Sequence, residues 1–230
     1  MKLLLALLTI STAVSFAQKA PERTCRILFL DGPDAAPETL HLFDGATSRE
    51  VDLPRMNFSR IYELRPGNLT LHLLSAPLDD PELVPPGAAS ATIPEGVTDF
   101  YLLLTSDPAN KVAPVRMQVI KTGSEHLKRG QMLWFNLTKN TIGGMVGSEK
   151  LVLNPNSRVT LDPPARGNGN YPVKLSFRIV GKEPLYPLCE TQWRHDPRSR
   201  SVAFVITERG IRTPRVLVFP DYREEPPKTP

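Results

Sequence analysis

The sequence predicts an all-β protein made of two tandem antiparallel β-sandwiches, and three observations favour this class. Apolar runs of strand length recur along the chain, and many of them alternate with polar residues. Each run is closed by Pro, Gly, Asn or Asp, and the 24 prolines are spread along the whole chain instead of forming one low-complexity tract. No window shows the i, i+3, i+4, i+7 apolar pattern of an amphipathic helix.

The predicted strands form two series with the spacing of sandwiches of about 100 residues each. The first series is 26–30, 39–43, 49–53, 59–64, 69–74 and 99–105. The second series is 115–121, 132–138, 141–146, 150–153, 158–161, 173–180, 202–207 and 215–219. Short helical turns are expected only near residues 81–84 and 123–128.

Turn chemistry supports the strand assignment. Asp44-Gly45 follows an apolar strand and is a hairpin signal. Pro66-Gly67 stands at the centre of a four-residue turn with the residues of type II. Gly143-Gly144 lies inside a strand-like stretch and predicts a bulge or close packing.

A weak internal repetition suggests that the two sandwiches are related. The segments RILFL, TLHLF and SREVDL of the first half are matched with VRMQVI, MLWFNLT and TIGGMV of the second. The polar, proline-containing stretch 106–114 resembles a linker, which predicts a first domain over 18–108 and a second over 109–222. The strand 115–121 could instead close the first sandwich, which would move the boundary by one strand.

The two ends of the chain and one internal loop have their own character. Residues 1–17 contain Lys2, a short apolar run and the small residues Ser15 and Ala17, which predicts a signal peptide cleaved before Gln18. Residues 223–230 are rich in proline and charge and are expected to form a disordered tail. Residues 76–96 contain five prolines and are predicted to be a long loop, the first place to look for a binding surface.

Charge and hydropathy exclude several classes of partner. The formal net charge of +4 is mild and argues against nucleic acid as a dedicated partner. No stretch after the leader is long and apolar enough to be a transmembrane segment. We expect no cofactor, and an envelope protein or polysaccharide is the expected kind of partner.

Two cysteines, Cys25 and Cys189, remain in a chain predicted to reach an oxidising compartment. A disulfide between them would close a very long loop and could stabilise the fold by up to about 5 kcal/mol. Two buried thiols in separate cores fit the alternation of the sequence equally well. Both possibilities stay open.

The sequence carries no catalytic or metal-binding signature. The four histidines are not at ligand spacing, and Gly-x-Ser-x-Gly is absent. Cys189 stands beside Glu190, which would raise the pKa of the thiol. His195-Asp196 could be an oriented pair, but adjacent residues usually point apart, and Pro197 suggests a loop.

Two features leave room for a binding function. If Leu133 and Phe135 face the core, then Trp134, Asn136 and Thr138 face outward and form a possible sugar-stacking platform. Packing of Trp134 under a loop or against the other domain is the favoured alternative. A group of arginines near the C-terminus, with acidic residues between them, could bind anions but more simply forms a mixed solvated surface: Arg194, Arg198, Arg200, Arg209, Arg212 and Arg215.

The first half of the mature chain resembles a family of exported bacterial immunoglobulin-like β-sandwich domains without an assigned function. The resemblance lies in the segment RILFLDGPDAAPETLHLFDGA, with its PDAxP turn between two strands, and continues through LRPGNLTLHL and EGVTDFYLLLTSD. It implies an immunoglobulin-like sandwich in the cell envelope or outside the cell. The family has no known active residues, so none is transferred.

Together these observations predict an exported, non-enzymatic structural or interaction module of the cell envelope or extracellular space. The alternative is a carbohydrate-binding module that uses Trp134, and an undetected hydrolase ranks last.

Overall fold

The computed structural model describes residues 23–208 and 210–223. The predicted signal peptide 1–17, the segment 18–22 and residues 224–230 of the predicted tail lie outside the described residues. Arg223, the first residue of that predicted tail, is described and makes ion pairs with the folded body.

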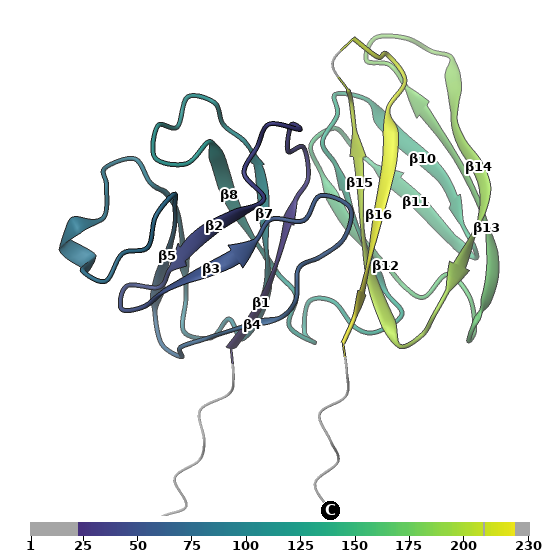
Figure 1. The fold of residues 1–230 in the computed structure, drawn as a ribbon. Helices are drawn as coiled ribbons and strands as arrows, with labels where there is room; N and C mark the ends of the chain where they lie inside the picture. Colours follow the sequence, from purple (N-terminus) through teal and green to yellow (C-terminus); the bar gives the residue numbers. More distant parts are fainter. Residues whose placement is uncertain (1–22, 209, 224–230) are drawn as a thin grey trace, which may run out of the picture.

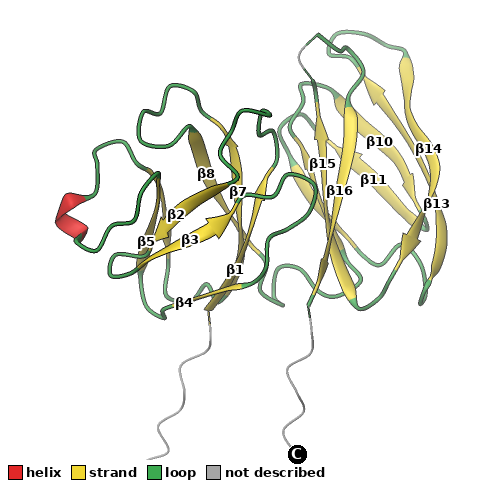
Figure 2. Cartoon of the chain, viewed as in Figure 1, coloured by secondary structure: helices red, strands yellow, loops and turns green. Residues whose placement is uncertain are grey.

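The described chain is all-β, as predicted, with one short 3-10 turn as its helical element (Figures 1 and 2). The first eight strands are β1 (Arg23–Phe29), β2 (Thr39–Phe43), β3 (Ser48–Asp52), β4 (Tyr62–Leu64), β5 (Leu69–Leu74), β6 (Ala89–Ile93), β7 (Asp99–Ser106) and β8 (Val115–Lys121). The next eight are β9 (Met132–Asn136), β10 (Thr141–Val146), β11 (Glu149–Leu153), β12 (Arg158–Leu161), β13 (Gly169–Arg178), β14 (Leu185–His195), β15 (Ser199–Ile206) and β16 (Arg215–Tyr222). The 3-10 turn η1 (Pro81–Leu83) confirms the helical turn predicted near 81–84, whereas residues 123–128 form only hydrogen-bonded turns.

The strands form four four-stranded sheets, which pair into two sandwiches. The sheet β4-β1-β7-β8 and the sheet β3-β2-β5-β6 enclose one apolar core, and β12-β9-β15-β16 and β11-β10-β13-β14 enclose another. In each sandwich the first strand pairs in parallel with the seventh, β1 with β7 and β9 with β15, and the remaining pairs are antiparallel.

The two sandwiches follow one plan. Adding eight to each strand number of the first sandwich reproduces the pairing order of the second, so β1 corresponds to β9 and β8 to β16. The repetition predicted from the sequence therefore exists, but its phase was wrong by one strand. VRMQVI is the last strand of the first sandwich, and the counterpart of RILFL is the strand that contains Trp134.

The junction between the sandwiches lies after β8. Strand β8 pairs with β7 from Phe100↔Lys121 to Ser106↔Val115, and the stretch 106–114 is the connection within this hairpin. The boundary predicted at 108/109 thus cuts through the first sandwich. The structure has the alternative arrangement, in which the strand 115–121 closes the first sandwich. The connection between sandwiches is residues 122–131.

The two sandwiches lie side by side (Figure 1), and a third apolar core joins them. It lies between the sheet of β1 and β7 and the sheet of β9 and β15, with Leu28, Tyr101 and Leu103 on one side and Phe135 and Phe204 on the other. Strands β7, β9 and β15 are therefore buried on both faces, which explains why their sequences are nearly continuous apolar runs. The four sheets form four layers with three cores.

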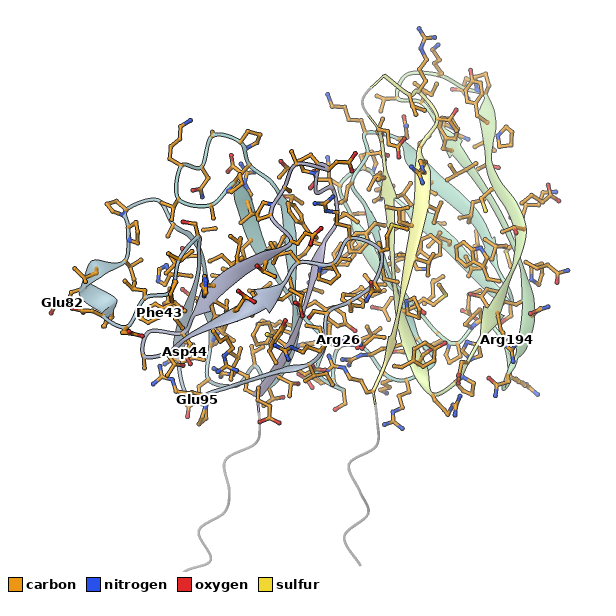
Figure 3. The ribbon with its side chains drawn as sticks, in the orientation of Figure 1. Arg26, Phe43, Asp44, Glu82, Glu95 and Arg194 are labelled. Atoms are coloured by element: carbon orange, nitrogen blue, oxygen red, sulfur yellow. The ribbon has the colours of Figure 1, made fainter. Side chains whose placement is uncertain are left out.

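A buried ion network closes this interface around Asp221, which has no exposed surface. Arg26 projects from the first sandwich toward the second and pairs with Asp221 (Figure 3). Tyr101 donates its hydroxyl hydrogen bond to Asp221 Oδ2 at 2.5 Å, and Arg200 and Arg223 each donate to the same oxygen at 2.9 Å. Burial alone would raise the pKa of Asp221, but the arginines and the Tyr101 hydroxyl outweigh it and hold the pKa at about 2.

Candidate binding site at the open edge of the second sandwich

The second sandwich has a cavity of about 360 Å³ along one edge, between β14 and β16. These are the terminal strands of its two sheets. The lining combines aromatic, aliphatic, hydroxyl and charged side chains: Gly130, Met132, Tyr171, Trp193, Arg194, His195, Asp196, Ser199, Ser201, Val216, Val218, Pro220 and Tyr222. Its volume is at the lower end of the range for small-molecule sites, about 300–1,000 Å³. We call it the edge pocket.

Strand β16 forms one wall because its two faces serve different neighbours. Leu217 and Phe219 belong to the core between the sandwiches, and Asp221 on the same face binds the first sandwich. The alternate residues Val216 and Val218 therefore turn toward the second sandwich's own core and line the edge pocket.

Aromatic side chains form the opposite wall. The indole of Trp193 stacks on that of Trp134, with ring centroids 5.9 Å apart and 14° between planes. Tyr171, the cross-strand partner of Trp193, meets it edge-on at 6.4 Å. The Tyr171 hydroxyl donates to Met132 Sδ at 3.5 Å, and burial raises the pKa of this tyrosine to about 12. This wall is rigidly packed from behind, while Trp193 keeps part of its surface exposed.

His195 places a polar atom in this wall. It ends strand β14 and is only 6% exposed, so the expected loop begins after it, at residues 196–198. Its Nε2 atom is buried and has no hydrogen-bond partner among the described residues. Burial lowers the pKa of the imidazole, and the charge of Asp196 opposes this only in part.

The polar groups at the rim are engaged with one another. Asp196 accepts hydrogen bonds from Nε and Nη2 of Arg198 at 3.1 and 2.9 Å, and these bonds hold the pKa of Asp196 at about 2. Ser199 Oγ donates to the Asp196 carbonyl oxygen at 3.0 Å. Within the described parts of the chain, neither Asp196 nor Ser199 has a hydrogen bond to His195. The pairing of a nucleophile with a base that covalent catalysis requires is therefore not formed at this rim.

The residues of the predicted sugar platform are placed differently from the expectation. Trp134 is fully buried in the second core, because the Leu133 and Phe135 face packs against the first sandwich instead of forming that core. Asn136 and Thr138 are buried as well. Asn136 Nδ2 donates to the carbonyl oxygens of Asn140 and Asn154 at 2.7 and 2.9 Å, and its Oδ1 accepts from the Thr138 hydroxyl at 2.8 Å. These residues organise turns and offer no surface to a ligand.

The two cysteines are free thiols in separate cores. Cys25 lies in the core of the first sandwich, and Cys189 packs against that of the second. Two sheets therefore separate them, and the disulfide alternative is not formed. Burial raises the pKa of Cys25 to about 12 and also raises that of Cys189, so both remain protonated.

The arginine group near the C-terminus does not form a common anion-binding face. Arg200 is buried in the ion network, Arg198 pairs with Asp196, and Arg215 pairs with Glu208. Arg209 lies outside the described residues. A hollow of about 420 Å³ lies beside Arg200 and Arg223, whose own charges already pair with Asp99 and Asp221 in the network.

In residues 23–208 and 210–223, no three His, Cys, Asp or Glu side chains gather in a way that could hold a metal ion. No helix there has the length and apolar character needed to cross a membrane.

Sequence reasoning missed the edge pocket because it missed β14. That strand contains Pro187, and one face of its second half reads Glu190, Gln192 and Arg194, so it lacks a clean apolar run. The segment between the predicted strands 173–180 and 202–207 nevertheless contains aromatic and apolar residues that could have indicated a strand: Tyr186, Leu188, Trp193 and His195. Comparison with known proteins finds no family model that matches the chain and no similar curated protein sequence.

Proposed function

We propose that this protein is an exported, non-enzymatic interaction module of the cell envelope or exterior, and that the edge pocket is its binding site. The observation that carries this proposal is a cavity of about 360 Å³ with one aromatic wall, at the edge between the terminal strands β14 and β16 of the second sandwich. The resemblance of the first half of the mature chain to exported immunoglobulin-like domains supports the same class of function.

The construction of the molecule suits recognition by a fixed surface. The third core and the ion network around Asp221 join both sandwiches, so β16 is held on its far side by the first sandwich. Trp193 is held from behind by Trp134. Both walls of the pocket are thus positioned before any ligand arrives, which lowers the entropic cost of binding.

Binding is favoured over catalysis by the state of the reactive groups. Both thiols are protonated, Ser199 is bonded to a backbone carbonyl, and the Asp196 carboxylate is occupied by Arg198. Recognition of a ligand requires none of these groups to be activated.

The test uses the chain's own fluorescence. Its two tryptophans, Trp134 and Trp193, are stacked together at the pocket, so intrinsic tryptophan emission reports on this site alone. A fragment library of neutral, cationic and anionic compounds is screened against the mature chain by ligand-observed NMR, and hits are titrated by fluorescence. We expect hits that shift the emission.

Two matched variants decide whether the hits bind in the pocket. Ser201→Phe fills it from β15, and Ser176→Phe adds the same ring to the outer face of β13, away from the pocket. Hits should be lost in Ser201→Phe and retained in Ser176→Phe. A library that yields no hits, or hits that both variants retain, rejects the edge pocket as the binding site.

Export is tested separately by fractionating a bacterial host that expresses the full chain. The exported product should begin at Gln18 by mass spectrometry. A full-length product confined to the cytosol would remove this part of the proposal.

A further inference from the structure

We propose that the edge pocket binds the ring of a neutral carbohydrate, with Trp193 against the apolar face of the sugar and His195 Nε2 bonded to a hydroxyl. This inference rests on the function proposed above and names the class of ligand. Three features of the pocket lead to it: an aromatic face, an unsatisfied buried nitrogen, and, among the described residues, the absence of an unengaged carboxylate at the rim.

The aromatic face is the first feature. Trp193 is half-buried because Trp134 and Tyr171 cover it from behind and from the side, yet it lines the pocket. An indole fixed in this way offers a flat apolar surface at low entropic cost. The C–H face of a pyranose is flat and apolar, and its hydroxyls point outward to polar neighbours. Tyr222 on β16 provides a second aromatic ring at the rim.

The unsatisfied nitrogen is the second feature. His195 lines the pocket and is more than nine-tenths buried, and its Nε2 has no partner among the described residues. Because Nε2 itself has no exposed surface, a hydroxyl reaches it when the imidazole turns toward the pocket. A buried polar atom without a hydrogen bond costs about 1–3 kcal/mol, which a ligand recovers if it supplies the bond. A hydroxyl both donates and accepts, so it satisfies either tautomer of the neutral ring. A purely apolar ligand would leave this cost in place.

The charge of the site is the third feature. Asp196 is neutralised by Arg198 through two side-chain hydrogen bonds, so it offers no unengaged carboxylate to a cationic ligand. Burial keeps the imidazole of His195 uncharged at neutral pH, so it offers no cation to an anionic ligand. Arg194 is exposed at the rim, and its charge is well solvated. A neutral ligand that carries hydroxyls meets these conditions.

The experiment compares sugar binding by the mature full-length chain and three variants. Neutral mono- and oligosaccharides of glucose, galactose, mannose and N-acetylglucosamine, together with uronic acids, are titrated by tryptophan fluorescence and saturation-transfer NMR. Trp193→Ala removes the stacking face, and His195→Phe keeps a ring but removes the nitrogen. Tyr186→Ala is the matched control, because Tyr186 is a half-buried aromatic of the same strand that packs on Phe177 outside the pocket.

We expect at least one neutral sugar to bind, and both Trp193→Ala and His195→Phe to weaken it at least about tenfold, which corresponds to about 1.4 kcal/mol. Tyr186→Ala should stay within about twofold of the unmodified chain on the same scale. Circular dichroism verifies that each variant is folded. If Trp193→Ala fails to fold, Ser201→Phe, which fills the pocket, replaces it and should abolish sugar binding.

The contrary outcomes separate the two proposals. Neutral and acidic sugars that fail to bind, while library fragments still bind in the pocket, would overturn the ligand class and leave the pocket as a binding site. Sugar binding that is unchanged in Trp193→Ala and Ser201→Phe would place the sugar elsewhere and overturn this inference. Uronic acids that bind more tightly than neutral sugars would overturn the charge argument. No binding by any compound would overturn both proposals.

Discussion

The two sandwiches share one strand order but differ in how closely their edge strands approach one another. In the first, β6 and β8 lie close together and close the sandwich. In the second, their counterparts β14 and β16 stay apart, and the edge pocket lies between them. The same plan thus yields a closed edge and an open one, and the difference arises from side chains and anchoring rather than from topology.

Side-chain size is the first cause of the difference between the closed edge and the open edge. Strand β6 has five residues, with the small Ala89 and Ala91 facing the first core. Strand β14 has eleven and carries bulky residues, among them Trp193. Small residues let the facing sheets approach, whereas an indole stacked on a second indole keeps them apart.

The anchoring of β16 to the first sandwich is the second cause. The end of β16 is held toward the first sandwich, because Asp221 binds Arg26 and Tyr101 across the interface. Strand β8 has Ile120 in the same third core, but its neighbour Val119 packs against the first core beside β6. A strand that is fixed on its outer face does not close over the inner one.

The largest expected effect is at Asp221. Asp221→Asn removes the carboxylate that pairs with Arg26 and leaves Arg200 and Arg223 with Asp99 as their ion-pair partner. Removal of one partner of a buried ion pair costs about 3–5 kcal/mol. Denaturant unfolding followed by circular dichroism measures this loss.

The control for Asp221→Asn is Glu190→Gln, which removes an exposed pair with Lys174 and should cost less than about 1 kcal/mol. If both substitutions have equally small effects, the ion network does not anchor β16, and anchoring does not explain the open edge.

The second prediction compares a phenylalanine introduced at the closed edge of the first sandwich with one introduced at the open edge of the second. Ala89→Phe forces a large side chain into the closed edge and should destabilise the protein by about 1–3 kcal/mol. Ser201→Phe enters the open edge, where a cavity accommodates it, and should change the free energy of unfolding by less than about 1 kcal/mol. Equal costs in thermal and denaturant unfolding would show that the edges do not differ.

The smallest expected effect is the pH dependence due to His195. Burial lowers its pKa in the folded state, so below its ordinary value of about 6.5 the unfolded chain binds more protons than the folded one. The free energy of unfolding should therefore fall as pH decreases from about 6.5, by at most about 1.4 kcal/mol per pH unit for one histidine.

His72 in the first sandwich shifts in the same direction for the same reason, so single variants separate the two contributions. His195→Phe and His72→Phe should each give a shallower loss of stability between pH 7 and pH 5 than the unmodified chain. A slope that is unchanged in His195→Phe would mean that His195 is hydrated in the folded state and that the edge pocket is wetter than its burial indicates.

The strands missed in the sequence are counterparts in the two sandwiches, β6 and β14. Both are terminal strands of the sheets that the third core does not cover, and their burial patterns alternate only weakly. The segment 76–96, predicted as a long loop, contains η1 and β6, whose residues are small and polar. Each pairs only with the strand that precedes it, β6 with β5 and β14 with β13, and the small or polar residues of these strands do not reveal that pairing in a local pattern.

Local pattern by itself determined the all-β class, most strand positions and the close packing at Gly144, where a Cβ would lie 2.0 Å from the Lys174 carbonyl oxygen. These properties depend on a few successive residues, because alternation, turn chemistry and backbone freedom are short-range. Only the tertiary structure decided that Trp134 is buried while Trp193 lines a pocket, and that Asp221 joins two sandwiches. Those facts depend on which sheet covers which face, and stacking of the sheets brings together residues far apart in sequence, such as Arg26 and Asp221.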